Sequence, residues 1–265
     1  MKRKNFVFIF LLLITLTLSA QDTNDSFYFV QITDTHLGTG NNSEFTQKLI
    51  DMINDLPMKI EIVLHTGDIV QYPLQQDSVL TNAKELFTQL EMPVLYVAGN
   101  HDIRKKSMQT STSIFEENFG PLMVDEEVMG VKFIGIFSNP LAWDFPMQDY
   151  DPLPELETEL IEAGDMPVIL FHHIPSVEDF YLNQMHDGWK EPDRSEWISL
   201  LNKYNVKAVL AGHFHRDEHH WLGVVPLYVC ASVTTKWGRQ PTFRIYEFKD
   251  GKLSYRTVYL EPEEE

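Results

Sequence analysis

The stretch VLYVAGNHD, residues 94–102, carries the most informative pattern in this chain. Val94 to Ala98 has the apolar, β-branched and aromatic composition of a buried strand. A turn accounts for Gly99 and Asn100, but it gives no reason for the His101 and Asp102 pair behind them. We interpret the stretch as a buried strand that presents chemically active side chains at its C-terminal end.

Four more apolar runs end in residues of the same kind. The polar residues at these strand ends are Asp34 and His36, Asp68 after Gly67, His172 and His173, and His213 and His215 after Gly212. Loops that leave the C-terminal edge of an open α/β sheet converge, so ligands bind there. The glycines before Asp68, Asn100 and His213 allow the chain to turn sharply and bring the side chain inward. We therefore expect five strands to supply one site.

Short apolar runs alternate with segments of helical period, and the first half of the chain has the pattern of βαβ units. The predicted strands are Phe27–Thr33, Ile60–His65, Val94–Ala98, Val131–Phe137, Val168–Phe171, Val206–Leu210, Pro226–Val233, Phe243–Phe248 and Leu253–Tyr259. The predicted helices are Glu44–Leu56, capped near Asn42 or Ser43, Val79–Leu90, capped near Asp77, and Ile114–Phe119, Glu155–Ala163 and Ser195–Tyr204. So many strands in one chain favour two sheets packed face to face with helices outside them, an α/β architecture.

The N-terminal segment has the pattern of a secretory signal peptide. Three basic residues, Lys2 to Lys4, precede an apolar run from Phe6 to Leu18, and the sequence turns polar after Ala20. A retained membrane anchor is the alternative, but the run is short for a bilayer span. We expect residues 1–20 to be a signal peptide cleaved near Ala20, an exported protein that is secreted or periplasmic, and a single domain over residues 21–265.

The acidic composition and the single cysteine restrict the classes of function. The formal net charge is −18, and a surface of that sign repels a nucleic-acid backbone. Cys230 is the only cysteine, so no disulfide forms within the chain and the core alone must stabilise it. We expect no nucleic-acid partner and no stable membrane anchor. No pattern in the sequence indicates an oligomeric state.

Each short motif taken alone also has a purely structural interpretation. Asp34 and His36 are two residues apart, so in extended backbone they face the same side and can bind one ion, yet such residues also cap helices or form turns. His213 and His215 have the same spacing. His172 and His173 are adjacent and point to opposite sides, so only one of them faces the site. The spacing leaves open which one.

The residue types at the strand ends predict a metal site. Oxygen and imidazole donors without thiolate suit manganese, iron or zinc better than calcium, which prefers oxygen alone. A pair of such ions could bind a phosphate oxygen, lower the pKa of a bridging water and stabilise the charge of an in-line attack. The donor types by themselves predict a site for first-row metal ions.

Taken in chain order, the five motifs resemble those of the calcineurin-like metallophosphoesterase superfamily, the group of dinuclear-metal enzymes that includes purple acid phosphatases. The resemblance covers Asp34 to His215 and implies a four-layer αββα sandwich of two mixed sheets flanked by helices, the metallo-dependent phosphatase fold. It assigns one metal ion to Asp34, His36 and His215, the other to Asn100, His213 and the strand-end histidine, and Asp68 to both ions. We assign His173 as that histidine, because His-x-Pro is the usual family form, and keep His172 as the fallback.

The resemblance also implies the reaction. A hydroxide that bridges two divalent or trivalent ions (Mn, Fe or Zn) attacks the phosphorus of a small phosphate mono- or diester. His101 protonates the leaving oxygen or stabilises the developing charge, and Asp102 orients the His101 ring. One departure from the family pattern is Gln71, where many relatives place Asp or Asn. No motif fixes a cation that binds the phosphate; the candidates are Arg104, after the His101 and Asp102 pair, and Lys236 or Arg239, near Trp237.

Two other classes of function compete with this hypothesis. A noncatalytic metal-binding or ligand-binding module would keep the fold, but the complete motif set with His101 argues against it. A nuclease would share the metal chemistry, but the acidic charge disfavours it. Two long aromatic stretches, Trp143 to Tyr150 and Tyr181 to Trp197, follow the strands, and we hypothesise that Trp143 and Trp189 select the organic group of the substrate.

Overall fold

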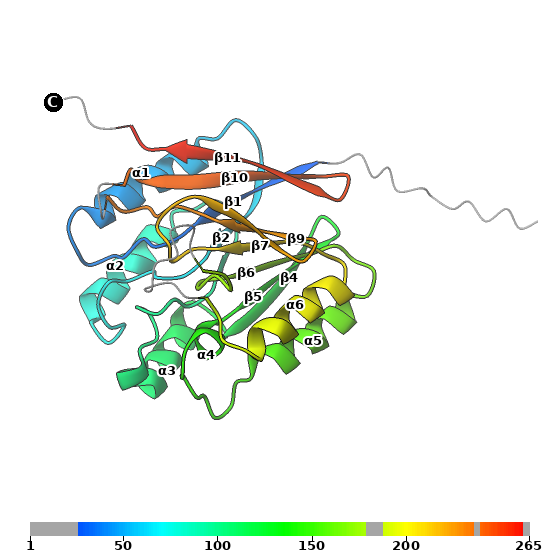
Figure 1. The fold of residues 1–265 in the computed structure, drawn as a ribbon. Helices are drawn as coiled ribbons and strands as arrows, with labels where there is room; N and C mark the ends of the chain where they lie inside the picture. The colour runs from blue at the N-terminus through cyan, green and yellow to red at the C-terminus, as the bar shows by residue number, and fades with distance from the viewer. Residues whose placement is uncertain (1–25, 179–187, 236–238, 262–265) are drawn as a thin grey trace, which may run out of the picture.

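The computed structural model describes residues 26–178, 188–235 and 239–261. Residues 1–20, Lys236 and the first part of the second aromatic stretch lie outside these ranges. Within them, two β-sheets pack face to face between two layers of helices (Figure 1). The predicted α/β class and four-layer sandwich are confirmed, as expected for a chain with so many short buried strands.

The first sheet has five strands. Their order is β11 (Lys252–Tyr259), β10 (Thr242–Lys249), β1 (Phe27–Ile32), β2 (Ile60–His65) and β3 (Val94–Tyr96). β1, β2 and β3 run parallel, so their C-terminal ends meet at one edge, whereas β10 is antiparallel to both of its neighbours. The sheet is therefore mixed, and its parallel part carries three of the predicted motifs.

The second sheet has six strands. Their order is β4 (Met123–Val128), β5 (Val131–Ile136), β6 (Val168–His172), β7 (Val206–Ala211), β9 (Val225–Val229) and β8 (Glu218–Leu222). β5, β6, β7 and β9 are parallel, and β4 and β8 close the two edges as antiparallel strands. The two remaining motifs follow β6 and β7 at the parallel centre of this sheet.

The outer layers consist of helices that bury one apolar face each. Helices α1 (Asn42–Asn54), α2 (Asp77–Phe87) and α3 (Met108–Asn118) pack with the first sheet, α3 directly after a short 3₁₀ turn at Lys105–Ser107. Helices α4 (Asn139–Ala142), α5 (Pro152–Ala163) and α6 (Asp193–Lys203) pack with the second sheet. The middle of the sandwich is aromatic: Phe29 lies edge-on to Phe133 of the opposite sheet and stacks on Tyr246.

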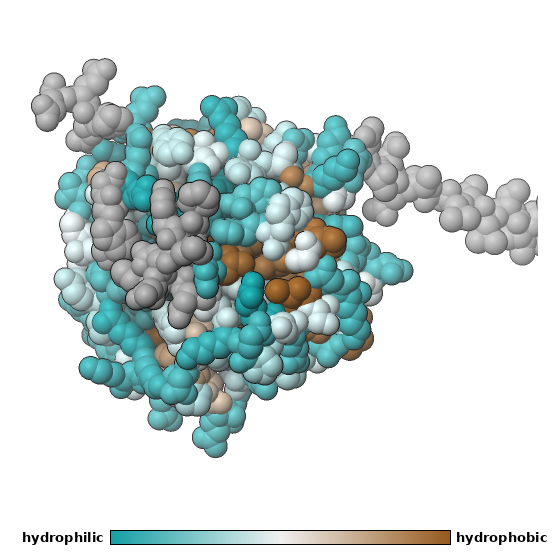
Figure 2. Space-filling model, viewed as in Figure 1, coloured by the Kyte–Doolittle hydropathy of each residue, from teal (hydrophilic) through white to brown (hydrophobic). Residues whose placement is uncertain are grey.

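One face of the molecule can be described by its hydropathy. Figure 2 shows that the face seen in Figure 1 is mainly hydrophilic, with one compact hydrophobic area to the right of centre. None of the helices in the described ranges has the length and apolar character needed to cross a membrane.

Two details of the predicted elements are wrong. The side chains predicted to cap α1 and α2, near Asn42 or Ser43 and near Asp77, make no capping hydrogen bond. The N-cap positions are Asn41 and Gln76, whose side chains make none either. Strands β4 and β8 were not predicted, because MVDEEV and EHHWL are polar edge sequences that lack the apolar runs of central strands.

Candidate metal centre

The seven predicted metal ligands come from the C-terminal ends of five parallel strands. Asp34 and His36 follow β1, Asp68 follows β2 and Asn100 follows β3, all in the first sheet. The second sheet supplies His173 after β6 and His213 and His215 after β7. The structure brings all seven side chains into two adjoining groups that span the two sheets.

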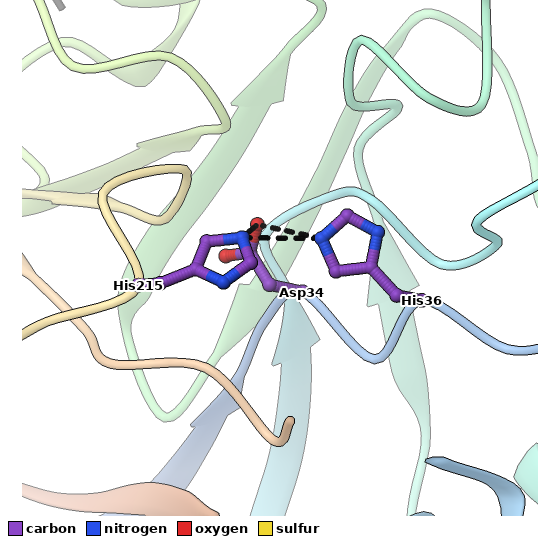
Figure 3. Close-up of side chains that lie close together, drawn as sticks. All are labelled: Asp34, His36 and His215. Carbon is purple, nitrogen blue, oxygen red and sulfur yellow. Dashed lines mark hydrogen bonds and ion pairs between the residues drawn. The ribbon is translucent and has the colours of Figure 1, made fainter. Parts of the chain in front are cut away.

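The first group contains Asp34, His36 and His215, whose rings face each other across the carboxylate (Figure 3). The Nε2 atoms of the two histidines are 3.1 Å apart. Asp34 Oδ1 lies 3.1 Å from His215 Nε2 and 3.7 Å from His36 Nε2. Three donor atoms therefore converge on one point.

The two oxygens of Asp34 have different surroundings. Oδ2 accepts hydrogen bonds from the Thr33 hydroxyl at 2.7 Å and from the His213 backbone N–H at 2.9 Å. Oδ1 is buried, and the side-chain nitrogens near it are those of His215 and His36. Burial of a carboxylate oxygen is costly unless a cation or a donor binds it, so this oxygen is held among the imidazole nitrogens where an ion could bind.

The second group centres on His173. Its Nε2 lies 3.1 Å from Asn100 Oδ1, 3.3 Å from His213 Nδ1 and 3.3 Å from Asp68 Oδ2. Its other nitrogen, Nδ1, is 2.8 Å from the Thr66 carbonyl oxygen, to which it donates. That bond fixes the ring and leaves Nε2 as the ligand atom, the usual way in which a backbone acceptor orients a metal-bound histidine.

Asp68 lies between the two groups. Its Oδ2 is 3.7 Å from His36 Nε2 in the first group and 3.3 Å from His173 Nε2 in the second. Its Oδ1 accepts a 2.7 Å hydrogen bond from the His101 backbone N–H, which sets the orientation of the carboxylate. Asp68 therefore has the position expected of a ligand that two ions share.

These distances fit bound metal ions. Ligand atoms about 2.1 Å from an ion in tetrahedral or octahedral geometry are separated by roughly 3.0 to 3.4 Å. Most of the spacings within each group fall in that range. Oxygen and imidazole donors without thiolate suit the divalent first-row metals.

The neighbouring histidines 172 and 173 have separate surroundings. His172 is buried on the opposite side of β6, between Trp189 at 5.0 Å and Trp197 at 5.5 Å between ring centroids. Burial there lowers the pKa of His172 to about 3. The structure therefore places His173, and not the fallback His172, beside the other predicted ligands.

Charge within the site favours cations. Burial alone would lower the pKa of His173, but the carboxylates of Asp68 and Asp34 raise it to about 9. Burial opposes ionisation of Asp68, yet His173 and His36 hold the pKa of its carboxyl well below the usual range. Burial lowers the pKa of His36, which keeps its ring neutral as a metal ligand must be.

Five of the predicted ligands have left-handed backbone, which non-glycine residues rarely adopt. The φ angles are 53° at Asp34, 43° at His36, 53° at Asp68, 70° at His213 and 54° at His215. The spacing of Asp34 and His36, and of His213 and His215, predicts that each pair faces one side of an extended strand. That prediction is wrong, because the backbone of both pairs is left-handed and not extended. Tight turns beyond the strand ends aim them at the site, a strain that is typical of functional residues.

The glycines before the ligands serve two purposes. Gly67 has a φ of 92°, so it provides the sharp turn that the sequence predicts. Gly212 has an ordinary φ, and a Cβ there would lie 2.0 Å from Thr33 Oγ1 and 2.8 Å from Asp34 Oδ2. Gly212 therefore lets its loop pack closely against the loop that carries Asp34. Gly99 likewise lets its loop pack closely against Asp68.

His101 lies at the rim of the cluster, where its ring is edge-on to His36 with centroids 4.8 Å apart. Its Nδ1 is 3.1 Å from the Gln71 carbonyl oxygen and 3.3 Å from Arg104 Nη2. These two residues orient the ring. Gln71, which departs from the family pattern, contributes both through its backbone carbonyl and through its side-chain Nε2, which lies 3.3 Å from His101 Nδ1.

The predicted role of Asp102 in orienting His101 is wrong. Asp102 is fully buried, and its carboxylate accepts hydrogen bonds from the backbone N–H groups of Ile69, Val70 and Gly99 at 2.8 to 3.2 Å. Burial and the nearby Asp68 charge raise its pKa to about 6. Asp102 joins the loops after β2 and β3, because their N–H groups need an acceptor.

The other sequence-based candidates have mixed outcomes. Arg104 donates to the carbonyl oxygens of Gln71 and His101, so its guanidinium is engaged in the loop. Arg239 lines a separate cavity with Glu44 and Leu260. Trp189 is a core residue whose indole N–H donates to the Ile174 carbonyl, so its predicted contact with substrate is wrong. Trp143 lies beside the ligands, with its ring centroid 6.0 Å from that of His213.

A sandwich of two mixed sheets with two adjoining groups of carboxylate, amide and imidazole donors at one edge defines a metallophosphoesterase that uses divalent metal ions. The chain belongs to the calcineurin-like phosphoesterase family, whose model matches residues 27–217. The recognition of this family from the five motifs is confirmed.

Individual relatives are more distant. A 3′,5′-cyclic adenosine monophosphate phosphodiesterase of Haemophilus influenzae is 26% identical over 213 residues, 73% of this chain and 72% of the relative. The serine/threonine-protein phosphatase CPPED1 of Mus musculus is 25% identical over 269 residues, 89% of this chain and 84% of the relative. A dimetal phosphatase structure from Danio rerio shares the fold, with a TM-score of 0.62, 12% identity, and coverage of 88% of this chain and 98% of that one.

Proposed function

We propose that this protein is an exported phosphodiesterase that hydrolyses small phosphate diesters, such as cyclic nucleotides, at two divalent metal ions. The observation that carries the proposal is the position of Asp68 Oδ2 between two sets of ligands, 3.7 Å from His36 and 3.3 Å from His173. Bound there, two ions would lower the pKa of a bound water and neutralise charge on the phosphoryl oxygens. Export rests on the signal-like pattern of residues 1–20.

His101 is the residue that we assign to the leaving group. Its Nδ1 lies 3.1 Å from the Gln71 carbonyl oxygen and 3.3 Å from Arg104 Nη2, so Nε2 is the ring nitrogen left to face a substrate oxygen. One of its ring nitrogens lies within 4.8 Å of the donor atoms of His36 and Asp68. From that position it protonates or stabilises the leaving oxygen and binds no metal itself.

The preference for a diester is supported by the space around the cluster. One cavity of about 370 Å³ adjoins His36 and Gln71, and another of about 400 Å³ adjoins Asn100 and Trp143. An acyclic diester carries an organic group on each side of the phosphorus and would occupy both cavities, whereas a monoester needs one such cavity. The Haemophilus influenzae relative is named for a cyclic diester.

The purified protein, loaded with Mn²⁺ or Zn²⁺, should be assayed on bis(p-nitrophenyl) phosphate, p-nitrophenyl phosphate and 3′,5′-cyclic AMP, with metal content measured in parallel. Asp68→Asn should lose metal and activity together. His101→Ala should keep its metal and lose about 10²- to 10⁴-fold in turnover, the usual contribution of a general acid. His219→Ala, an exposed histidine on β8, is the matched control and should behave as wild type.

Three results would contradict the proposal at separate points. Two bound metal ions without hydrolysis of any ester would support a noncatalytic module. Hydrolysis of the monoester alone would reject the diester preference. Full activity in His101→Ala would reject the role assigned to that ring.

A further inference from the structure

We propose that Trp143 forms the stacking wall of a subsite for an aromatic or heterocyclic organic group of the substrate, next to the Asn100 and His213 end of the metal centre. The inference rests on the proposed function and adds the chemical class of the group that the site selects. Three observations support it: the position of the indole, its surroundings, and its contrast with the other tryptophans of the described ranges.

The indole of Trp143 lies beside the second ligand group. Its ring centroid is 6.0 Å from that of His213, and the two ring planes are inclined by 67°. The side chain lines a cavity of about 400 Å³ that Asn100 also lines. A substrate phosphate at the metal centre therefore has its organic group within reach of the indole.

The backbone holds Trp143 in place before any ligand arrives. Trp143 directly follows helix α4 as its C-cap residue, and the backbone N–H of Trp143 donates to the Asn139 carbonyl at 3.0 Å. Two residues later Phe145 is buried, edge-on to Phe137 at 5.7 Å between centroids. An exposed aromatic ring on an anchored loop loses little conformational entropy on binding, so stacking against it is effective.

The cavity beside Trp143 suits a flat uncharged group. Phe145 and Ile103 form apolar parts of its lining. The charged residues on it, Lys105 and Asp144, bind each other, with Nζ 3.0 Å from Oδ2, so they neutralise one another. Its volume lies in the range of small-molecule subsites. A nucleobase or an aryl ring matches this lining better than an alkyl chain or a charged group.

The exposure of Trp143 separates it from the tryptophans that stabilise the fold. Trp189 and Trp197 are buried in the core behind β6, with 4% and 0% of their surface exposed. Trp143 is 37% exposed although it adjoins a metal ligand. Trp221 is 63% exposed on strand β8 and packs on His219, which makes it the matched control.

The test measures binding of two phosphonates, which have a P–C bond that a phosphoesterase does not cleave. Phenylphosphonate carries a ring and methylphosphonate does not, so their difference in affinity for the metal-loaded protein reports the subsite. Isothermal calorimetry should show tighter binding of phenylphosphonate to wild type. Trp143→Ala should weaken phenylphosphonate about tenfold, the scale of aromatic stacking on a base, and leave methylphosphonate unchanged.

Controls distinguish stacking from a structural effect. Trp143→Phe should retain most of the preference for the ring, and Trp221→Ala should match wild type with both ligands. Equal weakening of both phosphonates in Trp143→Ala would overturn the inference, because Trp143 would then only support His213. A loss of the ring preference in Tyr72→Ala instead would place the group in the cavity beside His36 and also overturn it.

The binding readout separates this inference from the proposed function. A ring preference that depends on Trp143, in a protein that hydrolyses no ester, would support the subsite and overturn the activity. Equal affinity of the metal-loaded wild type for both phosphonates, in a protein that hydrolyses the diester, would overturn the subsite and leave the activity standing.

Discussion

At the scale of single residues, the consecutive histidines His172 and His173 have opposite surroundings. His173 has a backbone acceptor on one nitrogen and three ligand atoms around the other. Both ring nitrogens of His172 are buried without a hydrogen-bond partner in the described ranges. Alternation along β6 produces the difference, since adjacent side chains of a strand point to opposite faces.

These surroundings predict opposite effects for one substitution. His173→Phe removes a ligand, so the protein should retain about one metal ion and lose turnover. His172→Phe should retain both ions and should stabilise the metal-free protein by about 1 kcal/mol, because the apolar ring replaces unpaired polar atoms. Elemental analysis and urea unfolding measure the two effects. Loss of metal in His172→Phe with retention in His173→Phe would reverse the assignment.

The ligand set was predictable from the sequence, but the geometry that assembles it was not. Each motif alone could be a turn or a helix cap, but five of them in the same order along the chain identify Asp34, Asp68 and their partners. Left-handed backbone at these positions has no signature in a single sequence. Two of the three partners of Asp102 are the backbone N–H groups of Ile69 and Val70, 33 and 32 residues earlier, which no local pattern encodes.

At the scale of elements, strands whose two faces are buried were predicted best. Ile60–His65 was predicted with both ends correct, since an apolar run of that length with β-branched residues has few alternatives. Strand β4 was not predicted, because three of its residues are acidic and exposed at a sheet edge. Its pairing with β5 depends on the turn at Met129 and Gly130, whose φ angles are 51° and 75°.

The end of strand β2 is held by a buried neutral histidine. Gly67 N–H donates to His65 Nδ1 at 3.2 Å, so Nε2 carries the proton and donates to Thr35 Oγ1 at 3.1 Å. Burial lowers the pKa of His65 to about 3. The ordinary pKa of a histidine is about 6.5, so below about pH 6.5 the unfolded chain binds a proton that folded His65 does not. The stability from His65 is therefore fully present above about pH 6.5 and is lost as the pH falls toward 3.

His65→Gln should therefore flatten the dependence of stability on pH. Between pH 6 and pH 4, the free energy of unfolding of wild type should fall more steeply than that of the variant, by up to about 1.4 kcal/mol per pH unit. Urea unfolding in the presence of a chelator measures both curves without a contribution from metal. Parallel curves would show that His65 is charged in the folded protein or exposed in it.

At the scale of the whole molecule, the metal centre joins two sheets that otherwise meet through an apolar layer. Three strands of the first sheet and two of the second supply the ligands. Ions bound there would connect residues far apart in sequence, from Asp34 to His215, and an ion that binds only the folded chain stabilises it.

Removal of metal should lower the melting temperature. Two sites, each saturated at 100 times its dissociation constant, add roughly 5 kcal/mol, which corresponds to about 10 to 20 °C for a domain of this size. Differential scanning calorimetry with and without EDTA measures the shift. Asp68→Asn should show a much smaller shift, and an equal shift in wild type and variant would place the stabilising metal elsewhere.

The left-handed backbone of the five ligands implies a conflict between stability and activity. An L-residue in that conformation costs about 1 kcal/mol relative to glycine, so five of them forgo several kcal/mol in a fold whose net stability is of the order of 5 to 15 kcal/mol. Exchanging these residues for glycine would relieve the backbone strain and remove the ligands at the same time. The fold therefore gives up stability at Asp34, His36, Asp68, His213 and His215 in order to aim metal-type side chains at one site.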